Sequence, residues 1–269
     1  NYSEDLRIDY SILDQHADSY RKIRNTFRYL LGNLNDNFEI NNFEEIDVNE
    51  LPELEQYVLH RLYCLNNNFK KYFRNYDFHN LYKELLNFCT VDLSAFYFDI
   101  RKDTLYCDPK NSTKRRSTII LLNIILNCLL KWFAPILSFT TEEIYRLIFK
   151  DSKSIHLEKF LEFPEKFQNE SLNNKWLELI KIRDICNISI EEKRASKEIG
   201  SSLEAELRIN INQKFKELTK NIDFSELCIT SQANVDYSDK DTTVVTSKAK
   251  GIKCPVCWKI SESPCPRHS

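Results

Sequence analysis

The sequence predicts a mainly α-helical fold: an antiparallel helical bundle, followed by a small mixed α/β module and a cysteine-rich tail. From residue 11 to about residue 149, apolar residues recur at the three- and four-residue spacing of amphipathic helices. Glycine occurs 3 times and proline 7 times in 269 residues, which leaves few positions for tight turns. The hydrophobic fraction of 42% is ample for a core.

The periodicity predicts five helices in the first part of the chain, over residues 11–34, 53–75, 78–101, 113–133 and 141–150. Short connections between consecutive long helices favour antiparallel neighbours. The first helix carries two stripes. One stripe is apolar and is expected to pack in the bundle, and beside it Arg21, Arg24 and Arg28 recur at the same spacing, offset by one residue.

The most apolar run of the chain, residues 119–130, is interrupted by Asn123 and Asn127. It is shorter than the roughly 20 residues that a membrane span needs, so we interpret it as a buried helix. Before the fifth helix, the order Thr140-Thr141-Glu142-Glu143 predicts a capping box. In that motif the Thr140 side chain accepts from the amide of Glu143, and the Glu143 carboxylate reaches back.

The pattern changes after a polar linker at residues 151–174. A further helix is predicted from Trp176 to Lys197. Beyond it we expect strands at residues 207–211, 227–230 and 243–246, with a short helix at 213–220. These predictions divide the chain into a helical bundle (1–155), a linker and long helix that complete the bundle or form a junction (156–200), a small α/β module (201–250) and a tail (251–269).

Charge is unevenly distributed, although the formal net charge is only -2. Residues 41–55 carry six acidic side chains and no Lys or Arg, and would repel a phosphate backbone. Residues 101–116 carry six basic side chains against two acidic ones, and would attract it. An arginine row can grip phosphates because guanidinium is always charged and can donate two hydrogen bonds to one anion. The alternative is a solvated basic flank on an ordinary helix.

Nine cysteines are present, and six of them are scattered singly: Cys64, Cys89, Cys107, Cys128, Cys186 and Cys228. Several lie in apolar runs, where a free cysteine packs as a small hydrophobic residue. No disulfide framework is indicated, which favours a reducing cytoplasm.

The tail holds two pairs of metal-binding residue types, Cys254 with Cys257 and Cys265 with His268. A two-residue spacer lets both side chains of a turn point at one ion, so the four residues suit a closed, structural Zn²⁺ site. Only residues 258–264 separate the two pairs, which is a short spacer. The alternative is a reducible thiol pair with His268 merely close to it.

Catalytic patterns are missing from the sequence. The glycines at 32, 200 and 251 stand alone, so they form neither a dinucleotide-binding turn nor a phosphate loop. His16, His60, His79 and His156 are spread singly, and each is more simply a structural or surface residue than a catalytic base. We therefore predict binding surfaces and no catalytic residue in this chain.

Seven segments together carry a family resemblance: residues 4–8, 19–26, 76–79, 96–103, 134–140, 199–205 and 253–258. In this order they resemble the C-terminal part of the bacterial-type isoleucyl-tRNA synthetases, a family of class I aminoacyl-tRNA synthetases. The Arg-Asn-Thr, Ala-Pro-Ile-Leu and Ser-Leu-Glu-Ala segments have counterparts in the valine and leucine enzymes. The Lys-Cys-Pro-Val-Cys-Trp segment indicates the isoleucine enzymes.

The resemblance implies that this chain is a fragment holding the anticodon-binding bundle, a junction and a zinc module. The absence of Met also favours a fragment. The intact enzyme would activate isoleucine with ATP and transfer it to tRNA-Ile. Its catalytic and editing domains, and hence its ATP site, would lie outside this chain, so the fragment alone would not be catalytic. We expect a cytoplasmic monomer that binds tRNA-Ile, with no DNA or membrane partner.

The resemblance also places an anticodon-contacting lysine at Lys102. Beside it, Arg101, Asp103 and Tyr106 would offer a phosphate contact, a base-edge acceptor and a stacking platform, which are the groups that unpaired RNA needs. Asp99 is expected to orient Arg101 or Lys102.

The other expected contacts are basic and metal-binding residues. Arg115 and Arg116 are candidates for the phosphate backbone. The arginine row either packs against neighbouring helices or holds the limb of the tRNA. In the tail, the family usually closes its zinc site with a second Cys-x-x-Cys pair after a longer spacer, whereas here His268 takes the last position.

Three rival interpretations remain open. The nearest is the same domain from a valine or leucine synthetase, against which the zinc tail argues. The second is a zinc-stabilised helical scaffold that binds protein rather than RNA. The third, a free-standing metalloenzyme, would need an open metal position, which a four-ligand tail does not offer.

Overall fold

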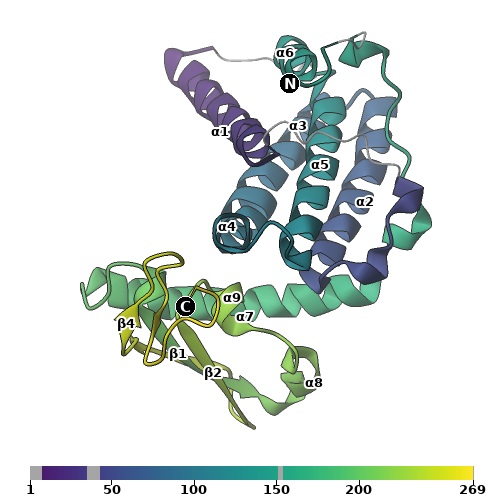
Figure 1. The fold of residues 1–269 in the computed structure, drawn as a ribbon. Helices are drawn as coiled ribbons and strands as arrows, with labels where there is room; N and C mark the ends of the chain where they lie inside the picture. The colour runs from purple at the N-terminus through teal and green to yellow at the C-terminus, as the bar shows by residue number, and fades with distance from the viewer. Residues whose placement is uncertain (1–7, 35–42, 151–153, 269) are drawn as a thin grey trace. The chain divides into compact units, whose positions relative to one another are not determined.

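The computed structural model describes residues 8–34, 43–150 and 154–268. The structure is mainly helical, with a small mixed sheet in the later part of the chain, as the sequence predicts (Figure 1). The chain divides into two compact units. Unit 1 spans residues 1–105 and 109–169, and unit 2 spans residues 106–108 and 170–269. The first of the resembling segments, residues 4–8, falls almost wholly outside the described residues.

Unit 1 is built from helices that match the predicted ones closely. They are α1 (Tyr10–Leu34), α2 (Glu53–Arg74), α3 (Phe78–Asn87), α4 (Phe98–Cys107), α5 (Thr113–Phe133) and α6 (Ser138–Ile148), with short 3₁₀ turns η1 (Phe43–Glu45), η2 (Val48–Glu50), η4 (Ile155–Leu157) and η5 (Glu165–Phe167). The last two residues of α4 group with unit 2.

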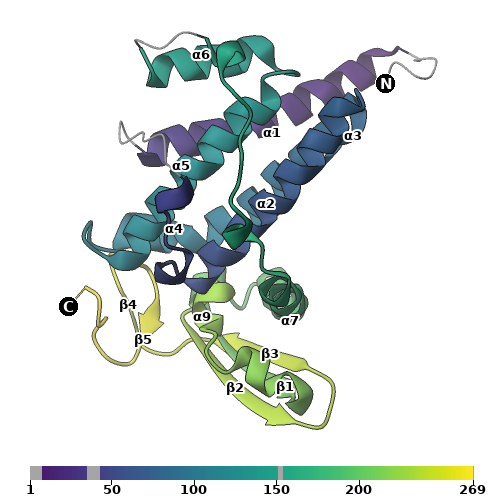
Figure 2. The same ribbon diagram turned by 90° about the vertical axis from the view of Figure 1, so that its right-hand side faces the viewer.

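Helix α5 forms the centre of unit 1 and packs against α1, α2 and α6 (Figure 2). It is long and apolar enough to cross a membrane by composition, but 72% of its most apolar window is buried inside the structure. The prediction of a buried helix is confirmed. Its polar interruptions are accommodated locally, since the Asn123 amide donates to the carbonyl oxygen of Ile119, 3.3 Å away.

The predicted third helix is longer than expected. Helices α3 and α4 are joined without a break by η3 (Phe88–Tyr97), a π-helical stretch. Asp77 caps the start, where its carboxylate accepts from the amide of Asn80. The run continues past Arg101 to Cys107 and ends before Pro109, because proline lacks an amide hydrogen and disfavours helical geometry in the residue before it.

The predicted capping box before α6 is wrong. The helix begins at Ser138, so Thr140 already lies inside it, and its hydroxyl is 2.9 Å from the hydroxyl of Tyr20 on α1. The Glu142 carboxylate accepts from the Ser154 hydroxyl and from the amide of Ile155. These contacts join α6 to α1 and to residues 154 and 155, and none of them caps the first turn of the helix.

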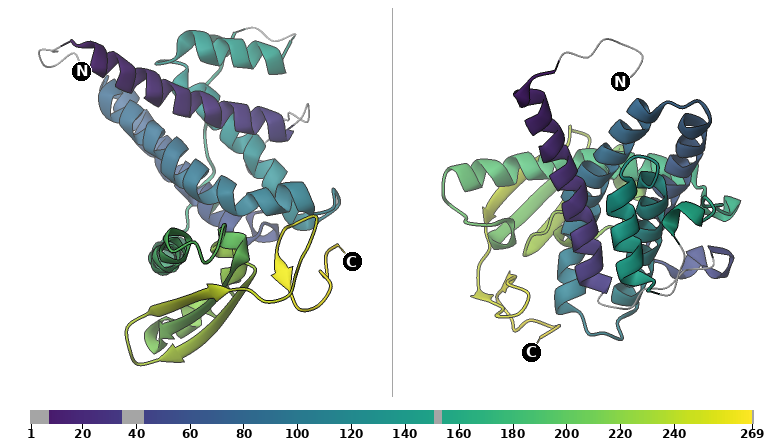
Figure 3. Two further views of the ribbon diagram at one scale, coloured as in Figure 1. Left: turned by 90° about the vertical axis from the view of Figure 1, so that its left-hand side faces the viewer. Right: turned by 90° about the horizontal axis from the view of Figure 1, so that it is seen from above.

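Unit 2 contains one long helix and a three-stranded sheet. The helix is α7 (Glu170–Ala195), and the strands are β1 (Ala205–Asn212), β2 (Gln232–Ser238) and β3 (Thr243–Lys248) in the order β2-β1-β3. Strand β1 is parallel to β2 and antiparallel to β3. Alternate β1 residues are buried, and α7 packs against β1 and β3. The long helix thus belongs with the sheet (Figure 3).

Small elements complete unit 2. They are the 3₁₀ turns η6 (Ser202–Glu204) and η7 (Gln213–Phe215), the one-turn helices α8 (Lys216–Thr219) and α9 (Phe224–Leu227), and the hairpin strands β4 (Ile252–Lys253) and β5 (Ile260–Ser261). The predicted strand at 227–230 is wrong, because Asp223 caps α9 there and the chain then turns at Ile229 with φ of 57°. Strand β2, three residues later, was not predicted.

Candidate nucleic-acid interface and metal centre

Lys102 stands on the outer side of α4, with 53% of its side chain exposed. Its ammonium group is 2.8 Å from a carboxylate oxygen of Asp99, one helical turn earlier. Asp99 was expected to orient Arg101 or Lys102, and of these two the structure pairs it with Lys102. An exposed ion pair at this spacing is weak, so Lys102 can exchange this partner for another anion at little cost.

Arg101 is the main correction to the predicted interface. Its side chain is 3% exposed, and Nε and a terminal nitrogen each lie 2.6 Å from one oxygen of Glu55 on α2. The hydroxyls of Tyr97 and Thr118 donate to the same carboxylate at 3.0 and 3.4 Å. Burial and the nearby Glu55 charge raise the pKa of Tyr97 well above its usual value, which keeps that hydroxyl a donor. Arg101 therefore holds the bundle together and is not presented to a phosphate.

Asp103 and Tyr106 occupy the rest of this helix. Asp103 is half-buried and belongs to unit 1. Tyr106 belongs to unit 2 and is 65% exposed.

The arginine row of α1 faces solvent. Arg21, Arg24 and Arg28 are all exposed, and Arg21 pairs with Asp18 at 3.0 Å. This exposure favours the alternative in which the row is open to a ligand over the one in which it packs against neighbouring helices. At the start of α5, Arg116 is exposed and Arg115 is half-buried, with its backbone amide donating to the Ser112 hydroxyl that caps the helix.

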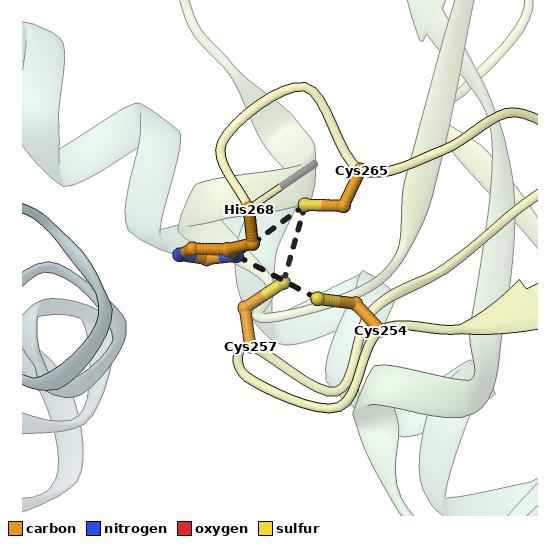
Figure 4. Close-up of side chains that lie close together, drawn as sticks. All are labelled: Cys254, Cys257, Cys265 and His268. Atoms are coloured by element: carbon orange, nitrogen blue, oxygen red, sulfur yellow. Dashed lines mark hydrogen bonds between the residues drawn. The ribbon is translucent and has the colours of Figure 1, made fainter.

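The four predicted metal ligands converge in unit 2 (Figure 4). His268 Nδ1 lies 3.6 Å from the sulfur of Cys254 and 3.4 Å from that of Cys265, and the sulfurs of Cys257 and Cys265 are 3.8 Å apart. A tetrahedral zinc with its ordinary bond lengths places neighbouring ligand atoms about 3.5–3.8 Å apart. The residues present therefore fit a Cys3His zinc site despite the short spacer.

Backbone hydrogen bonds favour the charged thiolate form of two cysteines in this cluster. The amides of Cys257 and Val256 donate to the Cys254 sulfur and lower the pKa of that thiol to about 6. The amide of Arg267 likewise lowers the pKa of Cys265. Cys257 is the more buried thiol, and burial raises its pKa to about 11. Thiolates are the metal-binding form, so two of the three sulfurs are already favoured as ligands.

The hairpin β4–β5 brings the first pair of ligands into position. Gly251 precedes it with φ of 118°, and a Cβ there would lie 2.1 Å from the carbonyl oxygen of Ser261. Only glycine fits this crossing. The turn closes where the Trp258 amide donates to the Cys254 carbonyl at 3.0 Å.

Contacts behind His268 fix its orientation. Nε2 lies 3.0 Å from the backbone carbonyl oxygen of Cys107 and therefore donates to it. That bond assigns the proton to Nε2 and leaves the Nδ1 lone pair for a metal. Next to it, Arg267 forms an ion pair with Asp108, and the Cys107 thiol donates to the Val256 carbonyl. The tail is thus fastened to residues 106–108.

The family model described as the anticodon-binding domain of tRNA ligase matches residues 55–209, from the start of α2 into β1. This match covers more than half of the chain. The chain belongs to the family of tRNA-ligase anticodon-binding domains.

Relatives of this anticodon-binding domain agree with the assignment. It is 71% identical to the isoleucine–tRNA ligase of Pelagibacter ubique over its whole length, and 40% identical to those of Agrobacterium fabrum and Zymomonas mobilis over 97% and 96% of its length. The chain spans only about 30% of the length of these relatives.

Two features of the anticodon-binding domain were not predicted from the sequence. Glu55 belongs to the acidic segment that was expected to repel phosphate, yet it lies beside Leu54 and Val58 on the helix face that becomes buried. A lone acid on an apolar face was the available signal for a buried partner. Cys107 is isolated in the sequence, and no local pattern reveals its contacts with a tail 149 to 161 residues away.

Proposed function

We propose that this chain is the tRNA-recognising part of an isoleucine–tRNA ligase. The family match over residues 55–209 carries the proposal. The likeness to isoleucine–tRNA ligases along the whole chain supports isoleucine as the amino acid that the complete enzyme uses. The complete enzyme would activate isoleucine with ATP at a site outside this chain and transfer it to tRNA-Ile. It would act as a cytoplasmic monomer.

In this proposal Lys102 is the central RNA-contacting residue. Its exposure and its weak tether to Asp99 support this role, because an incoming phosphate or base edge can replace the carboxylate without loss of a buried contact. Asp103 would accept from a base edge. Tyr106 would stack on an unpaired base, which its exposed ring permits.

The exposed arginines would supply the sequence-independent part of the affinity. Arg21, Arg24, Arg28 and Arg116 present guanidinium groups to solvent, with Arg115 half-buried at the start of α5. Each phosphate neutralised releases counterions from the RNA, so binding is expected to weaken steeply as salt rises.

Zn²⁺ is the metal we propose for Cys254, Cys257, Cys265 and His268. Three sulfurs and one imidazole nitrogen at tetrahedral separations match the preference of this ion and complete its coordination. When bound, the ion would hold the three thiols as thiolates and cross-link the tail, which is a structural role. The tail would then be held in one folded conformation and would take no part in catalysis.

The deciding experiment replaces Lys102 by Ala in the full-length enzyme. We expect weaker aminoacylation of tRNA-Ile and unchanged isoleucine-dependent pyrophosphate exchange, because activation by ATP takes place elsewhere. Lys83→Ala, at an exposed lysine of α3, is the matched control and should leave both activities unchanged. Equal loss in both assays would contradict the assignment.

The choice among amino acids has its own test. The same enzyme should charge tRNA-Ile with isoleucine, whereas charging of tRNA-Val or tRNA-Leu would favour a valine or leucine synthetase. A helical scaffold that binds protein would bind none of these tRNAs.

A further inference from the structure

A groove of about 430 Å³ runs between α1 and the continuous α3–η3–α4 helix, entirely within unit 1. These two helices lie side by side along η3 (Figures 2 and 3). The α1 wall contributes Lys22, Asn25 and Tyr29, which recur at the spacing of one helix face. This face lies next to the one that α1 buries in the bundle core.

The opposite wall depends on the π-helical stretch. Thr90, Ser94, Phe98 and Lys102 line the groove at every fourth position. In an α-helix, successive fourth residues rotate by about 40° in one direction, so this row would spiral away from the groove. A π-helix has wider turns of roughly 4.4 residues and rotates the row back by about 30° per step. Together η3 and α4 therefore keep all four side chains on one wall.

The chemistry of the lining is specific. Lys22 and Lys102 lie on opposite walls, and Asn25, Thr90 and Ser94 offer an amide and hydroxyls between them. Among the described residues that line the groove there is no carboxylate. A lining with two lysines and no carboxylate disfavours a metal cation, and an incoming anion can replace the exposed Asp99 carboxylate that pairs with Lys102.

One turn before Lys102 the groove is lined by a stacked aromatic pair. The rings of Tyr29 and Phe98 are stacked, with centroids 4.3 Å apart and planes at 19°. Phe98 is buried, whereas Tyr29 is half-buried, so the tyrosine forms the accessible part of this pair. Its hydroxyl donates to the carbonyl of Phe98 at 3.4 Å, which further restrains the ring.

We infer that the groove between α1 and η3–α4 binds one unpaired nucleotide of RNA. Lys22 and Lys102 hold its phosphates, Asn25 and Ser94 face the polar edge of its base, and Tyr29 bounds the apolar side. A groove of this size takes a single extruded nucleotide but excludes a duplex, and a lysine-flanked site with an aromatic wall is the usual chemistry for unpaired nucleic acid. This inference rests on the proposed tRNA-binding function and specifies where one nucleotide binds.

The test fills the groove in the full-length enzyme. Ser94→Trp places a large ring into the groove from an exposed position of η3, and Ala95→Trp places the same ring one residue later, at an exposed position outside the lining. We expect Ser94→Trp to weaken tRNA-Ile binding in a filter assay by roughly tenfold, about the contribution of one bound base. Ala95→Trp should change it less than twofold. Equal effects of the two substitutions would overturn the inference.

A charge substitution provides a second route if Ser94→Trp impairs folding. Asn25→Asp puts a carboxylate between the two lysines on an exposed helix face, and Gln15→Glu adds the same charge elsewhere on α1. Only Asn25→Asp should weaken tRNA binding. Lys22→Ala should lower the slope of log affinity against log salt by about 0.7, the value for one phosphate contact on a single strand. An unchanged slope would remove Lys22 from the site.

Cross-linking then identifies the occupant. A photoreactive amino acid at position 94 should label one nucleotide of tRNA-Ile, in an unpaired segment, as mapped by primer extension. Labelling in a paired stem, or none, would overturn the groove assignment. If groove variants have no effect while Lys102→Ala weakens aminoacylation selectively, the groove inference fails and the proposed function stands. If neither has an effect, both fail.

Discussion

The pair formed by Glu55 and Arg101 shows that a basic residue in a positively charged segment can be buried and neutralised by a distant carboxylate. Arg101 begins a basic segment in the sequence, yet its guanidinium is fully engaged by a carboxylate 46 residues earlier. Tyr97 and Thr118 complete the hydrogen bonding of that carboxylate. Removing one member of the pair leaves the other charge buried without a partner. This costs more folding free energy than the intact pair contributes.

We therefore expect Arg101→Met and Glu55→Gln each to lower the free energy of unfolding by about 3 kcal/mol. The double variant Glu55→Gln with Arg101→Met should lose less than the sum, because no unpaired charge remains. Urea unfolding of the four proteins, followed by circular dichroism, gives this comparison. Strict additivity would show that the two groups act independently.

At the scale of single elements, helix boundaries were the most predictable feature. The apolar spacing locates α2 and α5 to within a residue because tertiary packing uses the same face that the sequence displays. The π-helical geometry of η3 was not predictable, since it depends on how that stretch packs against α1. Strand β2 escaped prediction because its residues, Gln232–Ser238, are mostly polar and none is fully buried.

Helix α9 illustrates a signal that was present but unused. Asp223 followed three residues later by Glu226 is a helix-start pattern, and the Asp223 carboxylate accepts from the amides of Ser225 and Glu226. Although burial opposes ionisation, these hydrogen bonds leave the pKa of Asp223 below its usual value. Stability from this cap is therefore present above the ordinary aspartate pKa near 3.8 and is lost as pH falls through the lower folded value.

We expect Asp223→Ala to weaken α9 by about 1 kcal/mol at pH 7. The Cys228 amide, which donates to the Phe224 carbonyl, should then exchange its hydrogen about fivefold faster relative to its intrinsic rate. The difference between variant and parent should narrow below pH 3.8. A difference that stays constant down to pH 2 would mean that the carboxylate charge is not responsible.

For the whole molecule, the sequence indicated the four residues of the candidate metal centre but not the part of the chain to which they are attached. Cys254, Cys257, Cys265 and His268 were identified from spacing alone, and the structure brings them together. The attachment to Cys107 and Asp108 is a property of the folded chain. It makes the tail and the end of α4 one stabilised region.

Metal removal should therefore loosen two segments that are distant in sequence. The purified protein should contain about one zinc ion per chain, and a chelator, or Cys254→Ser, should release it. Hydrogen exchange should then accelerate at residues 106–108 as well as in the tail, while the amides of α5 remain protected. Faster exchange in the tail alone would show that the attachment does not depend on metal.

The hydrogen bond from His268 to Cys107 also sets an order of events during synthesis. Its two residues are 161 positions apart. At a translation rate of about 5–20 residues per second, the end of α4 is synthesised roughly 8–30 s before its partner. In that interval the Cys107 thiol and the last turn of α4 are uncovered. A nascent chain stalled before residue 254 should therefore be alkylated at Cys107 more readily than the released protein.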